Sequence, residues 1–247
     1  MKMGMIVIAA LVVGFAVWWT VAYPSGTWRY KMTVTVETPE GLKSGSAVRE
    51  VHVQRGWAPL PEMKPSVSLK GEAIAVDLGE RGVLFALLHG YRLGYNYARS
   101  LPFYVFPSGR GGTTVAGLKY YSTLKAGPVD ISPEWYPKFV HFKDSADPKT
   151  VKLVLEMEPC IDPETVRSSN ASYCITKDRF AEIYGEGVRL KSVTVEMTDE
   201  EVTRGVVERY MPSYANQREY MDWLLSLSYG DPRRIGPDAF GSVGVMR

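Results

Sequence analysis

The sequence predicts an α+β fold: an N-terminal transmembrane helix followed by a mainly antiparallel, β-rich domain with short interleaved helices. Three observations lead to it. One long uncharged apolar run stands at the N-terminus, several later segments alternate apolar and polar residues as half-buried strands do, and short segments with helical spacing lie between those strands. A chain of 247 residues that is 45% hydrophobic and 23% charged can bury a substantial core, which excludes a wholly disordered protein.

Residues 1–22 are predicted to anchor the chain in a membrane, as an uncleaved signal-anchor. No charged side chain occurs between Lys2 and Arg29, and residues 4–21 form an almost unbroken apolar run of 18 residues. As a helix this run would span about 27 Å, close to the ~30 Å hydrocarbon core of a bilayer. The residues that we expect to form the anchor are Met5, Ile6, Val7, Ile8, Leu11, Phe15, Trp18 and Trp19. A cleaved signal peptide is the alternative, with residues 20–22 as its only passable cleavage site.

The two cysteines, Cys160 and Cys174, bracket a Pro-, Ser- and Asn-rich stretch that is typical of a surface excursion. A disulfide between them would close a loop of 15 residues, worth up to ~3 kcal/mol on the chain-entropy model. Two unpaired thiols are the alternative, and a zinc pair is disfavoured because no histidine stands nearby. We predict the disulfide, and hence an oxidising compartment. Together with the anchor this places the protein in an inner membrane, with a cytoplasmic N-terminus and a periplasmic main domain.

The first half of the exported region is predicted to form mainly strands. Residues 27–38 and 46–55 alternate apolar and polar side chains and are predicted to form a long hairpin, with Arg49 on the apolar side of its second strand. Further strands are expected at residues 67–70, 72–78 and 83–88, to complete a meander of about five. The last of these is apolar throughout, which is typical of a core strand.

The second half mixes helices and strands. We expect helices at residues 113–125, 147–155, 176–184 and 216–227, and strands at residues 138–143 and 188–198. The Gly- and Pro-rich end has no periodic pattern, so it is predicted to be mobile or to order only on a partner. The expected organisation is an anchor at residues 1–22, one exported α+β domain at 23–229 and a mobile tail at 230–247.

Residues 90–106 are unusually rich in aromatic side chains, set among Gly and Arg. The aromatic residues are Tyr91, Tyr95, Tyr97, Phe103, Tyr104 and Phe106. One interpretation is a long loop whose rings cover the sheet. The other is an exposed contact patch for a partner or a membrane surface, with Arg92, Arg99 and Arg110 supplying polar contacts.

Motifs for catalysis or for cofactor binding are not found. The sequence has no G-x-S-x-G, no H-E-x-x-H, no Walker loop and no C-x-x-C, and its three histidines, His52, His89 and His141, are far apart. We therefore assign no catalytic, cofactor-binding or metal-ligating residue. A net charge of +2 provides no electrostatic attraction for nucleic acid, which is not expected as a partner.

Four segments resemble an uncharacterised family of bacterial proteins with one N-terminal hydrophobic segment and an exported domain. They are TWRYKMTVTVETPEGLKSGSAVREV, DLGERGVLFALL, HFKDSADPKTVK and YGEGVRLKSVTVEMTDEEVT. The resemblance implies the same topology. The family has no assigned activity, so the resemblance implies no site residue.

The function expected from these observations is that of a single-pass, membrane-anchored envelope protein whose exported domain mediates protein–protein interaction or assembly without catalysis. Its partner would be another protein of the cell envelope, bound through residues 90–106, the C-terminal segment or both. Two alternatives stay open. One is a periplasmic small-ligand-binding domain with the aromatic residues as a pocket wall. The other is an unrecognised hydrolase, which needs His89 or His141 beside an acid and a nucleophile.

Overall fold

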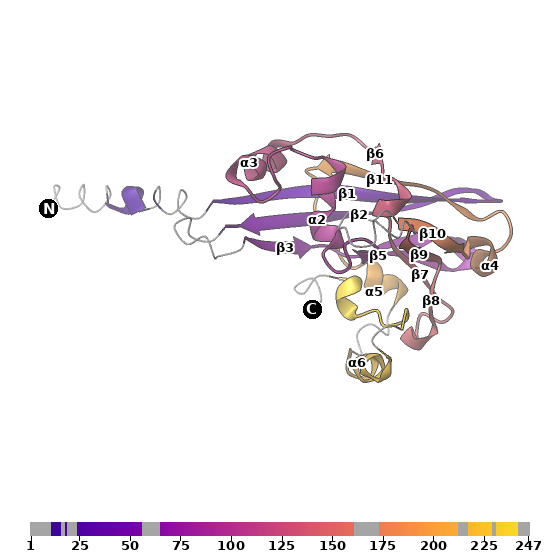
Figure 1. The fold of residues 1–247 in the computed structure, drawn as a ribbon. Helices are drawn as coiled ribbons and strands as arrows, with labels where there is room; N and C mark the ends of the chain where they lie inside the picture. The colour runs from indigo at the N-terminus through magenta and orange to yellow at the C-terminus, as the bar shows by residue number, and fades with distance from the viewer. Residues whose placement is uncertain are drawn as a thin grey trace.

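The computed structural model describes residues 11–15, 18, 24–55, 65–160, 173–211, 217–228 and 231–241. The fold is α+β, with antiparallel sheets and short helices, as the sequence predicts (Figure 1). The strands are β1 (Ser25–Thr38), β2 (Gly41–Gln54), β3 (Ser66–Lys70), β4 (Ile74–Asp77), β5 (Val83–Gly90), β6 (Val129–Asp130), β7 (Pro137–Phe142), β8 (Val151–Leu153), β9 (Leu155–Pro159), β10 (Tyr173–Asp178) and β11 (Arg189–Thr198). The helices are α2 (Tyr97–Val105), α3 (Val115–Thr123), α4 (Phe180–Tyr184), α5 (Val206–Tyr210) and α6 (Gln217–Ser226), with 3-10 turns η1 (Gly79–Arg81), η2 (Pro133–Trp135), η3 (Pro148–Thr150) and η5 (Pro237–Ala239).

The prediction of an N-terminal transmembrane helix, and with it of a single-pass inner-membrane protein, is corrected by the structure. Within the described residues, no helix is both long and apolar enough to cross a membrane. Of the expected anchor residues, Leu11, Phe15 and Trp18 are helical and 68%, 60% and 48% exposed. The others, Met5, Ile6, Val7, Ile8 and Trp19, lie outside the described residues. An apolar composition is necessary for a membrane span but not sufficient, because the span also needs a continuous helix of about 20 residues.

A five-stranded sheet, in the order β3-β2-β1-β11-β6, forms one layer of the fold. The predicted hairpin is confirmed: β1 and β2 pair along their whole length, from Ser25 opposite Gln54 to Thr38 opposite Gly41. Gly41 closes the turn with a φ of 120°, which L residues with a side chain rarely adopt. The predicted strand at residues 188–198 is also confirmed, as β11 on the other side of β1.

The second sheet, in the order β4-β5-β7-β8, packs against one half of this layer. The five predicted strands therefore do not form one meander, because β4 and β5 leave β3 for a second sheet. The two layers approach closely: a Cβ on Gly45 of β2 would lie 2.3 Å from the backbone oxygen of Ala75 in β4. Only glycine permits that approach. The other half of the β1–β2 inner face is covered by α2 and α3.

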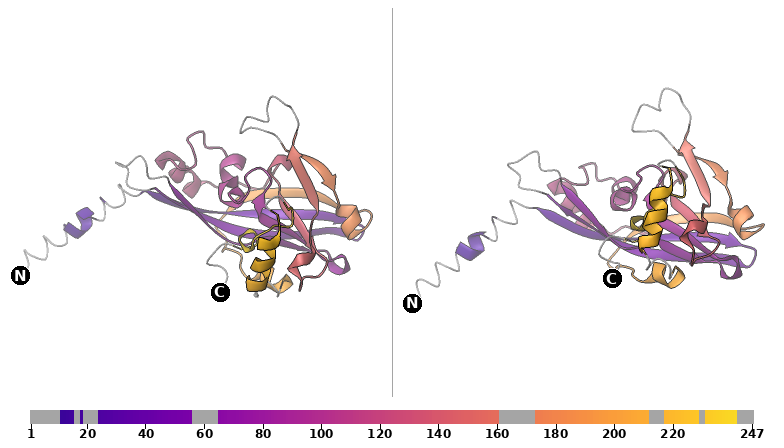
Figure 2. Two further views of the ribbon diagram at one scale, coloured as in Figure 1. Left: turned by 60° about the horizontal axis from the view of Figure 1, so that its bottom comes forward. Right: turned by 90° about the horizontal axis from the view of Figure 1, so that it is seen from below.

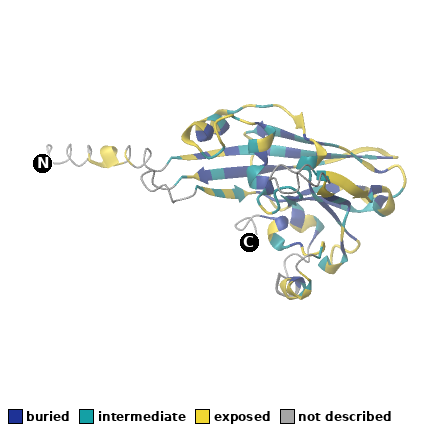
Figure 3. Ribbon diagram, viewed as in Figure 1, coloured by how far each residue is buried: buried dark blue, intermediate teal, exposed yellow. Residues whose placement is uncertain are grey.

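Both faces of β5 are buried, because five consecutive residues in it, 84–88, are buried; Figure 3 colours the whole chain by burial. One face of β5 contributes Leu84 to the core between the sheets, and the other face contributes Phe85 to a second core with the C-terminal part of the chain. The Phe85 and Phe240 rings pack edge to face there. In Figure 2, α6 lies on the side of the sheets away from α3. The apolar run at residues 83–88 is thus a core strand, as predicted.

The C-terminal segment is ordered where it is described. Ile235 and Phe240 are buried in the second core, and Ala73 N–H donates to Phe240 O at 2.7 Å. The mobility predicted for the tail from residue 230 onward stays a prediction. The segment folds without helical or strand periodicity because a few apolar side chains, spaced by a 3-10 turn, fill the outer face of the sheet. Residues 230 and 242–247 lie outside the described part.

Two predicted helices are partly wrong. Residues 147–155 form η3 and the strands β8 and β9, because Pro148 allows one 3-10 turn and the β-branched Val151 and Val154 favour extended structure. Residues 176–184 begin as β10, and only the last five form α4. The helices at 113–125 and 216–227 are confirmed as α3 and α6.

Candidate interaction surface

The structure divides the six aromatic residues of the segment 90–106 into buried and exposed rings. Tyr97 is 1% exposed and Phe106 is also buried, whereas Tyr95 and Tyr104 are 65% and 47% exposed. Tyr91 and Phe103 are half-buried. Some rings of this segment therefore cover the sheet and others face solvent, and the role of the exposed rings as a contact patch stays a prediction.

The helix α2, which carries three of these rings, was expected to be a loop. Pro102 in its interior has no N–H and leaves the carbonyl of Ala98 without its helical partner. Tyr30 of β1 supplies the missing donor: its hydroxyl donates to Ala98 O at 2.6 Å. A side chain from the sheet thus completes the helix.

Tyr97, the first residue of α2, fixes the same end of the helix. Its hydroxyl donates to Trp135 O at 2.8 Å, and its ring lies so close to Gly90 that a Cβ there would be 2.4 Å from it. Burial raises the pKa of Tyr97 well above its ordinary value. Tyr97 therefore joins β5, α2 and η2 into one rigid support.

A cluster at the surface rests on this support, formed by the exposed Tyr104 and by the half-buried Arg92, Glu134 and Trp135; we call it the Tyr104 cluster. The rings of Tyr104 and Trp135 stack with centroids 4.5 Å apart. The guanidinium carbon of Arg92 lies 4.3 Å from the Trp135 centroid, and Arg92 Nη1 donates to Glu134 Oε2 at 2.7 Å. Arg92 is therefore held in place by a ring and by a carboxylate.

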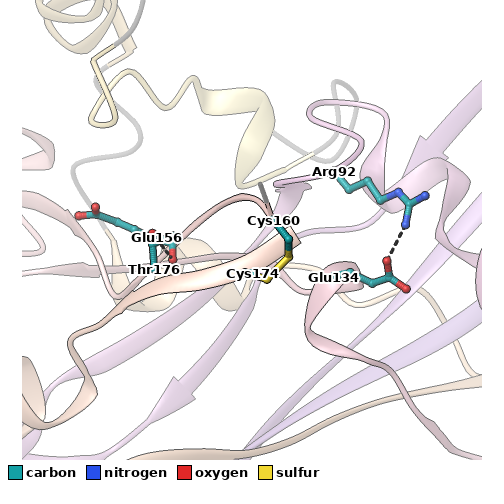
Figure 4. Close-up of a disulfide and its surroundings, with 6 residues drawn as sticks. All are labelled: Arg92, Glu134, Glu156, Cys160, Cys174 and Thr176. Carbon is teal, nitrogen blue, oxygen red and sulfur yellow. Dashed lines mark hydrogen bonds and ion pairs between the residues drawn. A yellow bond between two sulfur atoms is a disulfide. The ribbon is translucent and has the colours of Figure 1, made fainter. Parts of the chain in front are cut away.

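The predicted disulfide between Cys160 and Cys174 is confirmed. The Cα atoms are 5.2 Å apart, and the bond joins the end of β9 to β10. Figure 4 shows it close to Arg92 and Glu134, and β10 packs against η2. The Tyr91 hydroxyl donates to Leu155 O of β9, and burial raises the pKa of Tyr91. The structure thus places the aromatic segment beside the disulfide-linked hairpin, although no sequence pattern connects the two.

Trp135 and Glu134 are the residues of this surface that sequence reasoning missed. Both belong to η2, which begins at Pro133, a residue type that suits the first position of a helical turn. A Trp beside a Tyr in a proline-bounded turn was the available signal. Their proximity to Tyr104 depends on tertiary contacts, which no local pattern encodes.

The three histidines have separate partners. His52 contacts Thr27 Oγ1 at 2.8 Å. His141 packs edge to face with the Tyr184 ring, and burial lowers the pKa of His141. His89 Nε2 lies 3.0 Å from Asp238 Oδ2, and this contact lowers the pKa of Asp238. No group of three or more His, Cys, Asp or Glu side chains within the described residues is arranged to hold a metal ion.

Arg49 is placed as the alternation of its strand predicts, on the core face of β2. It is fully buried, its Nε donates to Glu72 O at 3.3 Å, and its guanidinium carbon lies 6.0 Å from the Tyr30 centroid. Glu72 in turn accepts from the N–H of Val207 at 2.8 Å, at the start of α5. These contacts connect β2, the segment between β3 and β4, and α5, which is a structural role.

Two clefts lie elsewhere on the surface. One of about 220 Å³ lies between β1, α3 and the end of β11, where Arg29 and Glu50 form an ion pair at 2.9 Å. The other, of about 300 Å³, lies beside β8 and β10. None of the six aromatic residues of segment 90–106 lines either cleft, so these clefts do not match the pocket wall that the ligand-binding alternative requires.

No family model, curated protein or solved structure matches this chain. The resemblance to the uncharacterised bacterial family stays a prediction. The functional argument therefore rests on the geometry of the surface.

Proposed function

We propose that this protein is a non-catalytic interaction protein of an oxidising compartment, which binds another protein through the Tyr104 cluster. The observation that supports this most directly is the exposed Tyr104 ring, which stacks on the half-buried Trp135, with Arg92 against the same Trp135 ring. Trp, Tyr and Arg are the residue types that most often dominate the binding energy of protein interfaces.

The support beneath the cluster favours binding as well. Because Tyr104 already stacks on Trp135 and Arg92 is already paired with Glu134, little side-chain freedom remains to be lost when a partner binds.

The disulfide supports the location. Structural disulfides persist where the environment is oxidising, as it is for exported proteins. The bond also links the end of β9 to β10 beside the cluster and limits the conformations of the unfolded chain.

Site-specific photocrosslinking tests the proposal. A photoreactive phenylalanine analogue replaces Tyr104 in the full chain, expressed in its native cells, and a second chain carries it at Leu42. Leu42 is 65% exposed on the β1–β2 hairpin and makes a matched control. We expect one dominant crosslinked protein from position 104 and none of that protein from position 42.

Affinity measurements on the purified partner complete the test. Trp135→Ala and Tyr104→Ala should each weaken binding by at least about 30-fold, which corresponds to the ~2 kcal/mol of an interface hot spot, and Leu42→Ala should leave it unchanged. Circular dichroism verifies that each variant is folded. Equal crosslinking at positions 42 and 104, or unchanged affinity in folded Trp135→Ala, would overturn the proposal.

A further inference from the structure

The larger cleft lies between β8, the β9–β10 hairpin, α4 and the C-terminal segment, about 300 Å³ in volume. It shares no residue with the Tyr104 cluster. Its lining residues fall into an apolar group and a charged group. The apolar group is Val151, Leu153, Pro232 and Ile235, and the charged group is Lys152, Glu156, Lys177, Arg179, Glu182 and Arg233.

The apolar group belongs to the folded core. Val151 and Ile235 are buried members of the second core, and Leu153 packs against it. This part of the cleft wall is therefore preformed and suits an apolar ligand group.

The charged group has an excess of cations. Arg179 is neutralised within the cleft, because it pairs with Glu156 and lies 3.7 Å from Glu182. Arg233 pairs with Asp231 at 2.6 Å. Among the residues that the structure describes, Lys152 and Lys177 form no ion pair, so they are the two cations that remain for a ligand.

We propose that this cleft binds a small amphipathic carboxylate, with its chain against Leu153 and its carboxylate at Lys152 and Lys177. An apolar wall beside two unpaired ammonium groups is complementary to a ligand with one apolar part and one negative charge. At about 30 Å³ for each non-hydrogen atom, the share of a water molecule in the liquid, the cleft accommodates about ten such atoms. Octanoate has this size and serves as the probe.

Calorimetric titration of the full chain at low ionic strength tests the ligand class. Three probes separate the two parts of the ligand: octanoate, octan-1-ol with the same chain and no charge, and acetate with the charge and a minimal chain. We expect saturable binding of octanoate, and binding at least tenfold weaker for the other two. Equal affinity for octanoate and octan-1-ol would reduce the cleft to an apolar contact and overturn the proposal, as would the absence of saturable octanoate binding.

Two variants test the location. Lys177→Ala removes one proposed contact and should weaken octanoate binding about fivefold, the upper end for a solvent-exposed charge pair. The matched control is Lys119→Ala, an exposed lysine on α3 that does not line the cleft. An equal effect of both variants would place the binding elsewhere. Raising the salt concentration should weaken octanoate binding to the unmodified chain in the same way, which tests the charge contribution without any mutation.

Discussion

Tyr97 and Tyr104 belong to the same helix and lie seven residues apart, which is close to two full turns. Two such residues share a face of the helix, yet Tyr97 is 1% exposed and Tyr104 is 47% exposed. The difference comes from what covers each end of α2. Tyr97 lies between Gly90 of β5 and the backbone carbonyl of Trp135 in η2, whereas Tyr104 stacks on the ring of Trp135 at the surface. Side-chain spacing therefore does not decide burial here; the neighbouring elements do.

Truncation of the two rings should show the largest contrast. Tyr97→Ala is expected to lower the free energy of unfolding by about 3–5 kcal/mol, because it removes a fully buried ring and leaves a cavity. Tyr104→Ala removes one stacking contact at the surface and should lower it by about 1 kcal/mol or less. Urea denaturation of both variants measures the difference. Similar losses in the two variants would show that Tyr104 is part of the core.

Filling the space beside the Tyr97 ring should lower the free energy of unfolding by a smaller amount. Gly90→Ala places a methyl group 2.4 Å from the Tyr97 ring, and the ring or the strand must move. We expect a loss of about 1–3 kcal/mol from this overpacking. Gly127→Ala is the matched control, because a Cβ at Gly127 meets no atom within 4 Å. Thermal unfolding of both variants compares them, and an equal shift in Tm would contradict the close packing of Tyr97 on β5.

The contrast between the two tyrosines also explains which parts of the molecule were predictable. Alternation along a strand is a local property, so the β1–β2 hairpin, β11 and the core position of Arg49 follow from sequence alone. The disulfide was predictable because only two cysteines occur, in a loop-like context. Helix α2 was missed, because Pro102 argues against a helix unless Tyr30 is known to supply a donor to Ala98.

The features that were predicted wrongly or missed depend on more than local composition or periodicity. The predicted membrane anchor was based on the apolar composition of residues 4–21, and composition alone does not establish a helix of sufficient length. The packing of Phe240 in the second core was not predictable either, because its segment lacks periodicity and the residue packs by tertiary contact alone. The Tyr104 cluster combines two segments about 30 residues apart in the sequence, and no motif predicts the contact between them.

The hydroxyl group of Tyr97 gives the smallest effect and the most specific one. Tyr97→Phe keeps the ring and removes the hydrogen bond to Trp135 O, which should lower the free energy of unfolding by about 1 kcal/mol at pH 8. Because burial raises the pKa of Tyr97, the folded protein keeps the hydroxyl proton above pH 10, whereas the unfolded chain loses it. The unfolded state then binds fewer protons, so the stability of the unmodified chain falls as the pH rises above about 10. Tyr97→Phe lacks this contribution, and its deficit relative to the unmodified chain should shrink between pH 8 and pH 10.5 in urea denaturation. A deficit of the same size at both pH values would show that the Tyr97 hydroxyl ionises as readily in the folded protein as in the unfolded chain. That result is incompatible with the burial of Tyr97 between α2 and β5.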